Sequence, residues 1–253
     1  MRNFSEVDSL GSRKTKYATM PLPRIRNLRL YSVEPILFLV SFASILSDAP
    51  LQDLFLKKVC EGMPDISDDV CASLPQHPEA ERLVQPKATI LLMCKSLIET
   101  LLPAFAAFWV GPWSDRTRKR KPLLIAPLTG FAILYSMLAI LSSIPSLPAN
   151  YLLLASIPVG FTGGLVTVFT AVTCIIGDET EGNGRRRTLR LGLLQASFVL
   201  GLLPASLCSA ALFQALNYSG VFLISGSFSF MALIIALYVT QDSPTLIAGG
   251  EAG

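Results

Sequence analysis

Long apolar stretches alternate with short polar connections along most of the chain. A membrane-spanning helix needs about 20 mostly apolar residues to cross roughly 30 Å of hydrocarbon. Six stretches meet this requirement: about Val33–Leu56, Ala88–Val110, Leu123–Ile144, Tyr151–Gly177, Leu189–Leu216 and Val221–Tyr238. The pattern therefore predicts an all-α membrane protein with six transmembrane helices.

The polar segments around these stretches predict how the chain is divided. We expect a basic cytoplasmic tail over 1–30, a six-helix transmembrane bundle over 31–240 and a short cytoplasmic tail over 241–253. A long extracellular or lumenal loop is expected at about 57–87, and cytoplasmic loops at about 111–122 and 178–188. The first apolar stretch is too long for the core of a signal peptide and carries Asp48.

Composition supports a membrane protein. Hydrophobic residues make up 51% of the chain and charged residues only 15%, whereas soluble domains carry roughly a quarter charged residues. The apolar excess lies in the long stretches, so the lipid bilayer is the expected surrounding of the bundle.

The basic residues predict the orientation. Seven Lys and Arg precede the first stretch, five lie in the second connection and four lie around the start of the fifth stretch. All sixteen fall on one side if the six spans are real. The other side has only four, namely Lys57, Lys58, Arg82 and Lys87. This bias places both termini in the cytoplasm, which requires an even number of spans.

The cysteines and the single histidine, His77, argue against a zinc site or a disulfide framework, and no metal site is expected. Cys60 and Cys71 both fall in the long outer loop. If that loop faces an oxidising compartment, they can pair with each other, or one can pair with a cysteine elsewhere.

Three charged residues inside the apolar stretches stand out as candidates: Asp48, Lys95 and Glu99. Charges at the bilayer centre cost on the order of 2.5–3.5 kcal/mol each, so they usually face a cavity or a partner. Lys95 and Glu99 are four residues apart on one helical face, where they can pair and fix helix packing; Lys95 can also extend towards the outer surface. Asp48 precedes Ala49 and Pro50, a helix break that suits a cavity wall.

Small residues mark the fourth and fifth stretches. Gly160, Gly163 and Gly164 in the fourth allow close helix packing, or a bendable helix that lines a path. Gln195 lies just inside the cytoplasmic end of the fifth. The chain has no nucleotide-binding loop, metal cluster or nucleophile with a base, so we expect neither an enzyme, a cofactor nor a nucleic-acid partner.

Three motifs carry a resemblance to a known family. The segment GPWSDRTRKRKP, residues 111–122, resembles the cytoplasmic loop motif of the major facilitator superfamily. Together with VEPILFLVSF and SDAPL near the start, and RRTLRLGLLQASF at 186–198, it is similar to the proton-coupled folate transporter and the solute-carrier 46 family. The resemblance covers essentially all six predicted helices.

The resemblance implies a transporter of twelve helices in two six-helix halves, of which this chain is the N-terminal one, built from 3+3 inverted repeats. It implies that substrate binds near the midplane between the halves. It also implies a cytoplasmic gate motif, Gly111, Asp115, Arg116 and Arg120, that latches the halves when they close. Alternatively, these charges only anchor the topology.

Two departures from the family pattern affect the expected mechanism. Arg118 stands where the superfamily motif has its second glycine, and Gln195 stands where the folate-transporter pattern has a glutamate used in proton coupling. Glutamine does not titrate, so we expect Asp48 or Glu99 to replace the lost proton site. The expected substrate and proton pathway is therefore Asp48, Lys95, Glu99 and Gln195.

The resulting hypothesis is alternating-access transport of a small solute, an organic anion or folate-like molecule, with protons as a candidate coupling ion. The chain would act as half of the transporter, as a homodimer or with a second six-helix half. The alternative is a non-transporting truncated isoform that associates with a full-length transporter; a six-span receptor or channel fits less well. Plasma membrane and endolysosomal membrane fit equally.

Overall fold

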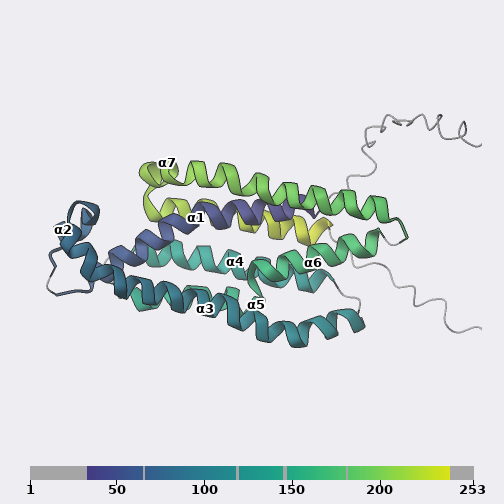
Figure 1. The fold of residues 1–253 in the computed structure, drawn as a ribbon, viewed down its shortest axis with the longest axis horizontal. Helices are drawn as coiled ribbons and strands as arrows, with labels where there is room; N and C mark the ends of the chain where they lie inside the picture. Colours follow the sequence, from purple (N-terminus) through teal and green to yellow (C-terminus); the bar gives the residue numbers. More distant parts are fainter. Residues whose placement is uncertain (1–32, 65, 118–119, 145–146, 181, 240–253) are drawn as a thin grey trace, which may run out of the picture. The chain divides into compact units, whose positions relative to one another are not determined.

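Helices account for almost all of the structure (Figure 1). The computed structural model describes residues 33–239, apart from 65, 118–119, 145–146 and 181. In chain order the helices are α1 (Glu34–Glu61), α2 (Asp68–Ala72), η2 (Leu74–Gln76), α3 (Pro78–Thr117), α4 (Lys121–Ser142), η3 (Ala149–Tyr151), α5 (Leu152–Thr162), α6 (Gly164–Glu179) and α7 (Gly184–Val239). The predicted tails over 1–30 and 241–253, and Arg118, lie outside the described residues.

Five helical segments of the described chain are long and apolar enough to cross a membrane. They are Glu34–Glu61, Pro78–Trp109, Lys121–Ser142, Ala149–Glu179 and Gly184–Tyr238. Each of the first four overlaps one predicted apolar stretch. The last contains both the fifth and the sixth, because α7 runs through the connection that the sequence places between them.

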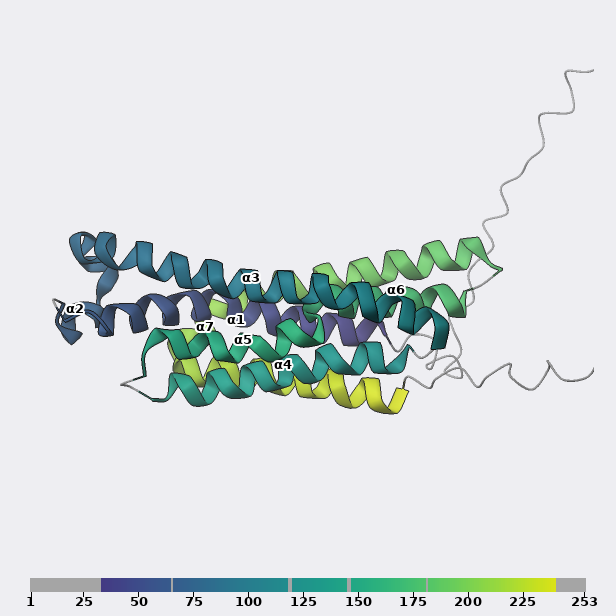
Figure 2. The ribbon, with the colours of Figure 1, turned by 90° about the horizontal axis from the view of Figure 1, so that it is seen from below.

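Helix α7 is two helices joined at Asn217. That residue has φ 57° and ψ −172°, which is not helical, and it lies inside an element of 56 residues. At 1.5 Å per residue a straight helix of this length would extend about 84 Å, well beyond the hydrocarbon layer. The chain instead reverses near Asn217, and the first limb (184–216) and second limb (218–239) run in opposite directions (Figures 1 and 2).

The fourth segment is broken at its middle by glycine. Gly163 ends α5 with φ 97°, and Gly164 starts α6 with φ 56°. A side chain is strained at such angles, which explains glycine at both positions. Gly160 instead allows α5 to pack closely against α3, because a Cβ at this position would lie 2.9 Å from the Ile98 backbone oxygen. The glycines thus both kink this segment and let it pack against α3.

The main core surrounds α1. Buried side chains of α1, among them Ile36, Val40 and Phe55, pack with apolar side chains of α4, α5, α6 and α7. Pro50 has no backbone N–H to donate to the Leu46 carbonyl. The Ser209 hydroxyl of α7 donates to that carbonyl at 2.9 Å in a buried position. The sequence predicts a helix break at Pro50, but α1 continues through it to Glu61, and the carbonyl that Pro50 frees is satisfied by helix packing.

Helical structure extends into the segment 57–87, where the sequence predicts an outer loop. Helix α1 continues to Glu61 and α3 already begins at Pro78, with α2 and η2 between them. Apolarity marks where lipid contact begins, whereas backbone hydrogen bonding lets a helix continue into water. For the same reason α3 extends to Thr117 into the predicted loop at 111–122, and α7 starts at Gly184 inside 178–188.

Cys60 and Cys71 form a disulfide, with their Cα atoms 5.6 Å apart. The bridge belongs to a small second core that also contains Val59, Leu74 and Val84. Lys58 donates hydrogen bonds to Glu61 at 2.9 Å and to the Ile144 carbonyl at 3.0 Å. This end of the bundle is therefore held by a folded cap.

The connections alternate between the two ends of the bundle (Figure 1). The cap around α2 and the turn of α7 lie at one end. The junctions α3–α4 and α6–α7 lie at the other, and these bring Arg116, Arg120 and the residues 185–187 to that end. The arginine-rich connections thus share one end of the structure.

Candidate functional site

A cavity of about 610 Å³ lies between α1 and α3. Its polar lining residues are Asp48, Gln52, Thr89, Lys95, Ser96 and Thr100. Its apolar lining residues are Leu51, Leu92, Met93, Leu97 and Leu101. A cavity of this size with a mostly apolar wall and a few polar groups is typical of small-molecule sites.

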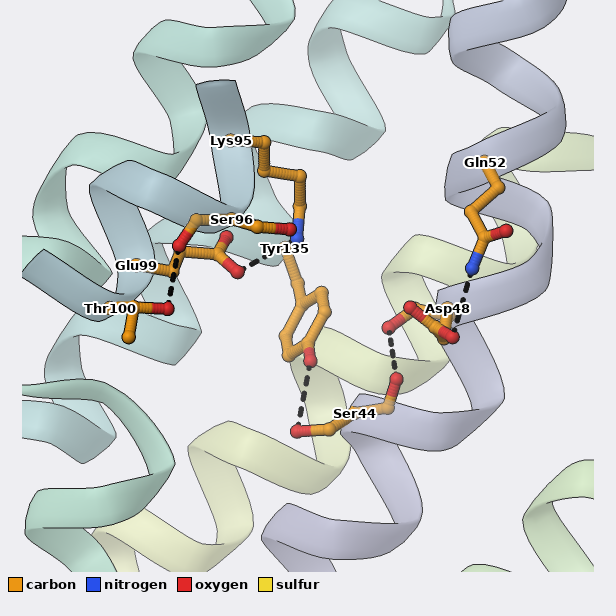
Figure 3. Close-up of polar contacts among 9 residues, drawn as sticks. Ser44, Asp48, Gln52, Lys95, Ser96, Glu99, Thr100 and Tyr135 are labelled. Carbon is orange, nitrogen blue, oxygen red and sulfur yellow. Dashed lines mark hydrogen bonds and ion pairs between the residues drawn. The ribbon is translucent and has the colours of Figure 1, made fainter. Parts of the chain in front are cut away.

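Asp48 contributes a carboxylate to the cavity from α1. Its side chain is exposed, and its Oδ2 atom accepts a hydrogen bond of 3.1 Å from Nε2 of Gln52, one helical turn further along (Figure 3). The i, i+4 spacing of these residues places both on the same face of the helix. Both side chains are exposed, whereas Val40, Ala43 and Phe55 of the same helix are buried.

Lys95 and Glu99 form an ion pair on α3. The Lys95 Nζ atom lies 2.8 Å from Oε2 of Glu99, and the two side chains are 15% and 24% exposed (Figure 3). Lys95 lines the cavity. Its charge is therefore balanced within its own helix, which agrees with the pairing alternative drawn from the i, i+4 spacing.

Tyr135 of α4 was not singled out by sequence reasoning. Its ring is buried, and its hydroxyl lies 3.4 Å from Oγ of Ser44 on α1. In Figure 3 the ring lies between the Lys95–Glu99 pair and the Asp48 side chain. A tyrosine inside an apolar stretch is an inconspicuous residue in sequence, so only the packing of α4 against α1 identifies it.

The structure does not bring all four predicted pathway residues together. Asp48 and Lys95 line one cavity and Glu99 pairs with Lys95. Gln195 is exposed on the first limb of α7 and is not among the described residues that line this cavity. Helix neighbours are not encoded in apolar periodicity, so the sequence alone could not separate Gln195 from the others.

The other end of the bundle carries the predicted gate motif. Gly111 and Arg116 are exposed near the end of α3, and Arg120 precedes α4. Nε of Arg120 donates to Oδ2 of Asp178 at 3.1 Å, which ties the start of α4 to the end of α6. Asp115 lies in the last turn of α3, but its side chain is not among those described.

A second charged cluster at this end was missed. Arg190 of α7 is 1% exposed, and its Nε and Nη2 atoms donate to Oε1 of Glu34 at 3.2 and 3.1 Å. Its Nη1 atom donates to Oε2 of Glu179 at the end of α6. Because a buried charge must be paired, this cluster fastens the start of α1 to the α6–α7 junction. The sequence treated Arg190 only as one basic residue among sixteen.

Known proteins resemble this chain over most of its length. Residues 90–252 match the family described as the Major Facilitator Superfamily. The chain is 28% identical over 233 residues to a "Probable peptidoglycan muropeptide transporter SLC46" of Drosophila melanogaster, covering 87% of this chain and 44% of that protein.

A second relative is a "Lysosomal proton-coupled steroid conjugate and bile acid symporter SLC46A3" of Gallus gallus. It is 24% identical over 221 residues, which covers 83% of this chain and 47% of that protein. The chain thus spans about half the length of the curated relatives it matches, and both are named as transporters rather than enzymes. It is a multi-pass membrane protein that belongs to the major facilitator superfamily and resembles its solute-carrier 46 members.

Proposed function

We propose that this chain forms a six-helix half of a solute transporter that works by alternating access. The observation that carries the proposal is the cavity of about 610 Å³ between α1 and α3, where Asp48 and Lys95 lie within the apolar stretches of these helices. Charged residues at membrane depth are costly and usually mark a substrate or ion pathway. Membership of a superfamily of transporters supports this role for the cavity.

The proposal requires six crossings, with α7 contributing two. Its two antiparallel limbs around Asn217 support this number. The six would form the 3+3 inverted repeat of one transporter half. The arginine-rich end, with Arg116, Arg120 and Arg185, would face the cytoplasm, and the disulfide-bonded cap would face outside or into a lumen.

The proposed substrate is a small organic solute, with an organic anion or a folate-like molecule as the expectation from sequence. Protons are the candidate coupling ion, in line with the printed name of the chicken relative, which is called a proton-coupled symporter. In this chain the proposed proton-binding carboxylates are Asp48, which lines the cavity, and Glu99, which pairs with the lining residue Lys95. Uptake that stays equally sensitive to pH after Asp48→Asn and Glu99→Gln together would contradict this assignment.

A second wall of the passage must come from a partner, either another copy of this chain or a second six-helix half. The apolar side chains exposed along α3, such as Phe105 and Phe108, supply a face for helix packing or lipid. At the cytoplasmic end, Gly111, Asp115, Arg116 and Arg120 would latch the two halves. The alternative is a non-transporting chain that associates with a full-length relative.

Reconstituted vesicles test the proposal. We would measure uptake of a bile acid and of a muropeptide by the full chain, alone and together with a separately expressed second half, at acidic and neutral pH. Native mass spectrometry of the same samples gives the oligomeric state. Uptake by a two-half assembly supports the proposal. A monomer without uptake in either condition, or uptake equal to empty vesicles, favours the non-transporting alternative.

The proposed location is the plasma membrane or an endolysosomal membrane. The chicken relative is named as lysosomal, and a disulfide-bonded outer cap fits the lysosomal lumen as well as the cell exterior. Fluorescent tagging of the full chain in cells, with lysosomal and plasma-membrane markers, distinguishes them.

A further inference from the structure

Several polar groups of the α1–α3 cavity already donate a hydrogen bond within the protein, so they offer a ligand mainly acceptor atoms. Gln52 uses Nε2 to donate to Asp48, at 3.1 Å. Thr89 donates its hydroxyl hydrogen to the Gln85 carbonyl at 2.8 Å, and Thr100 donates its own to the Ser96 carbonyl at 2.7 Å. A hydroxyl that has given its single hydrogen to the backbone has only oxygen lone pairs left for a ligand.

The charged residues at the cavity also favour a ligand that donates hydrogen bonds. Lys95, the cation of the described lining, lies 2.8 Å from Glu99, so its charge is balanced inside the wall. Asp48 is exposed and accepts one bond from Gln52, although a carboxylate can accept about four. Within the described residues, Oε1 of Glu99 is buried without a hydrogen-bond partner. Lys95 and Glu99 thus balance each other, and Asp48 leaves these three residues with a net negative charge.

Apolar side chains make up the rest of the cavity lining. Leu92, Met93 and Leu97 of α3 and Leu51 of α1 surround these acceptors with carbon surface. Such a wall favours a solute that has an apolar skeleton and hydrogen-bond donors attached to it. A carboxylate placed against Asp48, Thr89 and Thr100 would face oxygen lone pairs and a negative charge, which is unfavourable.

We propose that this wall binds the donor-bearing side of an amphipathic solute, with hydroxyl, amide N–H or ammonium groups directed at Asp48 and at the hydroxyl oxygens of Thr89 and Thr100. An anionic group of the same solute faces away from α1 and α3. This inference rests on the proposed role of the cavity, and it adds which chemical groups the cavity recognises and how the solute is oriented.

Three small probes of one skeleton test the inference: 1-adamantanemethylamine, 1-adamantanemethanol and 1-adamantanecarboxylate. Binding to the full chain in lipid nanodiscs is measured by equilibrium dialysis, with empty nanodiscs subtracted to remove partition into lipid. The expected order of affinity is amine first, alcohol second and carboxylate last. The carboxylate is expected to bind roughly tenfold or more weakly than the amine, because a hydrogen bond to a charged group is lost.

Substitutions assign the binding to this wall. Asp48→Asn keeps the shape and should weaken the amine roughly tenfold while changing the alcohol much less. Asp69→Asn removes the same charge from an exposed position in α2 and serves as the control, with no change expected. Thr100→Val should weaken the alcohol and provides a second test should Asp48→Asn fold poorly.

The opposite results overturn the inference. These are a carboxylate that binds most tightly, amine binding that is unchanged in Asp48→Asn, or no saturable binding of any probe. Dialysis reports binding without transport, so failure here is separate from failure of the proposed function. Vesicle uptake that occurs while the carboxylate binds most tightly would remove the inference and leave the proposed function standing.

Discussion

Helices α1 and α3 line the same cavity but have opposite environments in the bundle. In its most apolar 18-residue stretch α1 has 61% of its residues buried, whereas the corresponding stretch of α3 has 6%. Both are apolar enough to span a membrane. Apolarity therefore identifies a span without saying what covers it: α1 is covered by its own chain, and α3 needs lipid or a partner.

The two helices also contribute differently to the cavity. Helix α3 supplies most of the cavity lining, including Lys95, Ser96 and Thr100, while α1 supplies Asp48, Leu51 and Gln52. A peripheral helix can shift at little cost to the core, whereas α1 is fixed at its N-terminal end by Arg190 and near Pro50 by Ser209. We infer that α1 is the fixed wall of the cavity and α3 the adjustable one.

The largest effect on stability is expected from removing the buried ion pair at the N-terminal end of α1. Arg190→Ala leaves the buried Glu34 without its partner, and losing one member of a buried ion pair costs about 3–5 kcal/mol. The unfolding midpoint of the detergent-solubilised chain measures this. Arg186→Ala, an exposed neighbour on the same helix, is the control and should change stability little. Equal effects of the two substitutions would show that α1 is not anchored in this way.

Truncating a phenylalanine on each helix tests the contrast directly. Phe55→Ala in α1 removes a fully buried ring and should cost about 3 kcal/mol, because a cavity is left behind. Phe105→Ala in α3 removes a ring that is 63% exposed and should cost much less for the isolated chain. The same unfolding assay compares them. Similar losses would mean that α3 is as enclosed as α1.

The C-terminal end of α1 and the N-terminal end of α3 are joined through the disulfide-bonded cap. Replacing both Cys60 and Cys71 by serine releases a cross-link between residues 11 positions apart. This should lower stability by about 2–4 kcal/mol, mainly by freeing the unfolded chain. Thermal unfolding with and without a reducing agent reports it, and the double serine variant should no longer respond to the reductant. Unchanged stability of the wild type on reduction would count against a structural bridge.

Close packing of α5 holds α3 to the bundle at one point. An alanine at position 160 would place its Cβ 2.9 Å from the Ile98 oxygen, so α3 must move away. Overpacking of this kind costs about 1–3 kcal/mol. Gly192→Ala is the matched control because a Cβ there meets nothing within 4 Å, and it should be neutral or slightly stabilising. The reverse order of the two variants would refute close α3–α5 packing.

Local features were predictable from the sequence, whereas contacts between distant segments were not. The ion pair of Lys95 and Glu99 follows from their spacing on one helix. Arg190 and Glu34 are 156 positions apart, and nothing in a single sequence joins them. The apolar stretches predicted the spanning helices, but they did not reveal that α3 lies at the edge or that Gln195 lies outside the cavity.

Glycine illustrates the same limit at single positions. The sequence marked Gly160, Gly163 and Gly164 for packing or bending without deciding between them. The structure assigns close approach to Gly160 and a left-handed backbone to the other two. Both readings of the motif were physically sound, because the same residue type serves both purposes and only backbone angles separate them.

Thiol labelling tests most directly whether the cavity between α1 and α3 is filled with water. In a chain whose free cysteines Cys94, Cys174 and Cys208 are replaced, Ser96→Cys places a thiol in the cavity and Phe105→Cys places one on the exposed apolar face of α3. A water-soluble, membrane-impermeant maleimide is added to reconstituted vesicles. The account predicts fast labelling at position 96 and little at position 105, where lipid or a partner excludes water. Absent labelling at 96, or equal labelling at both, would contradict it.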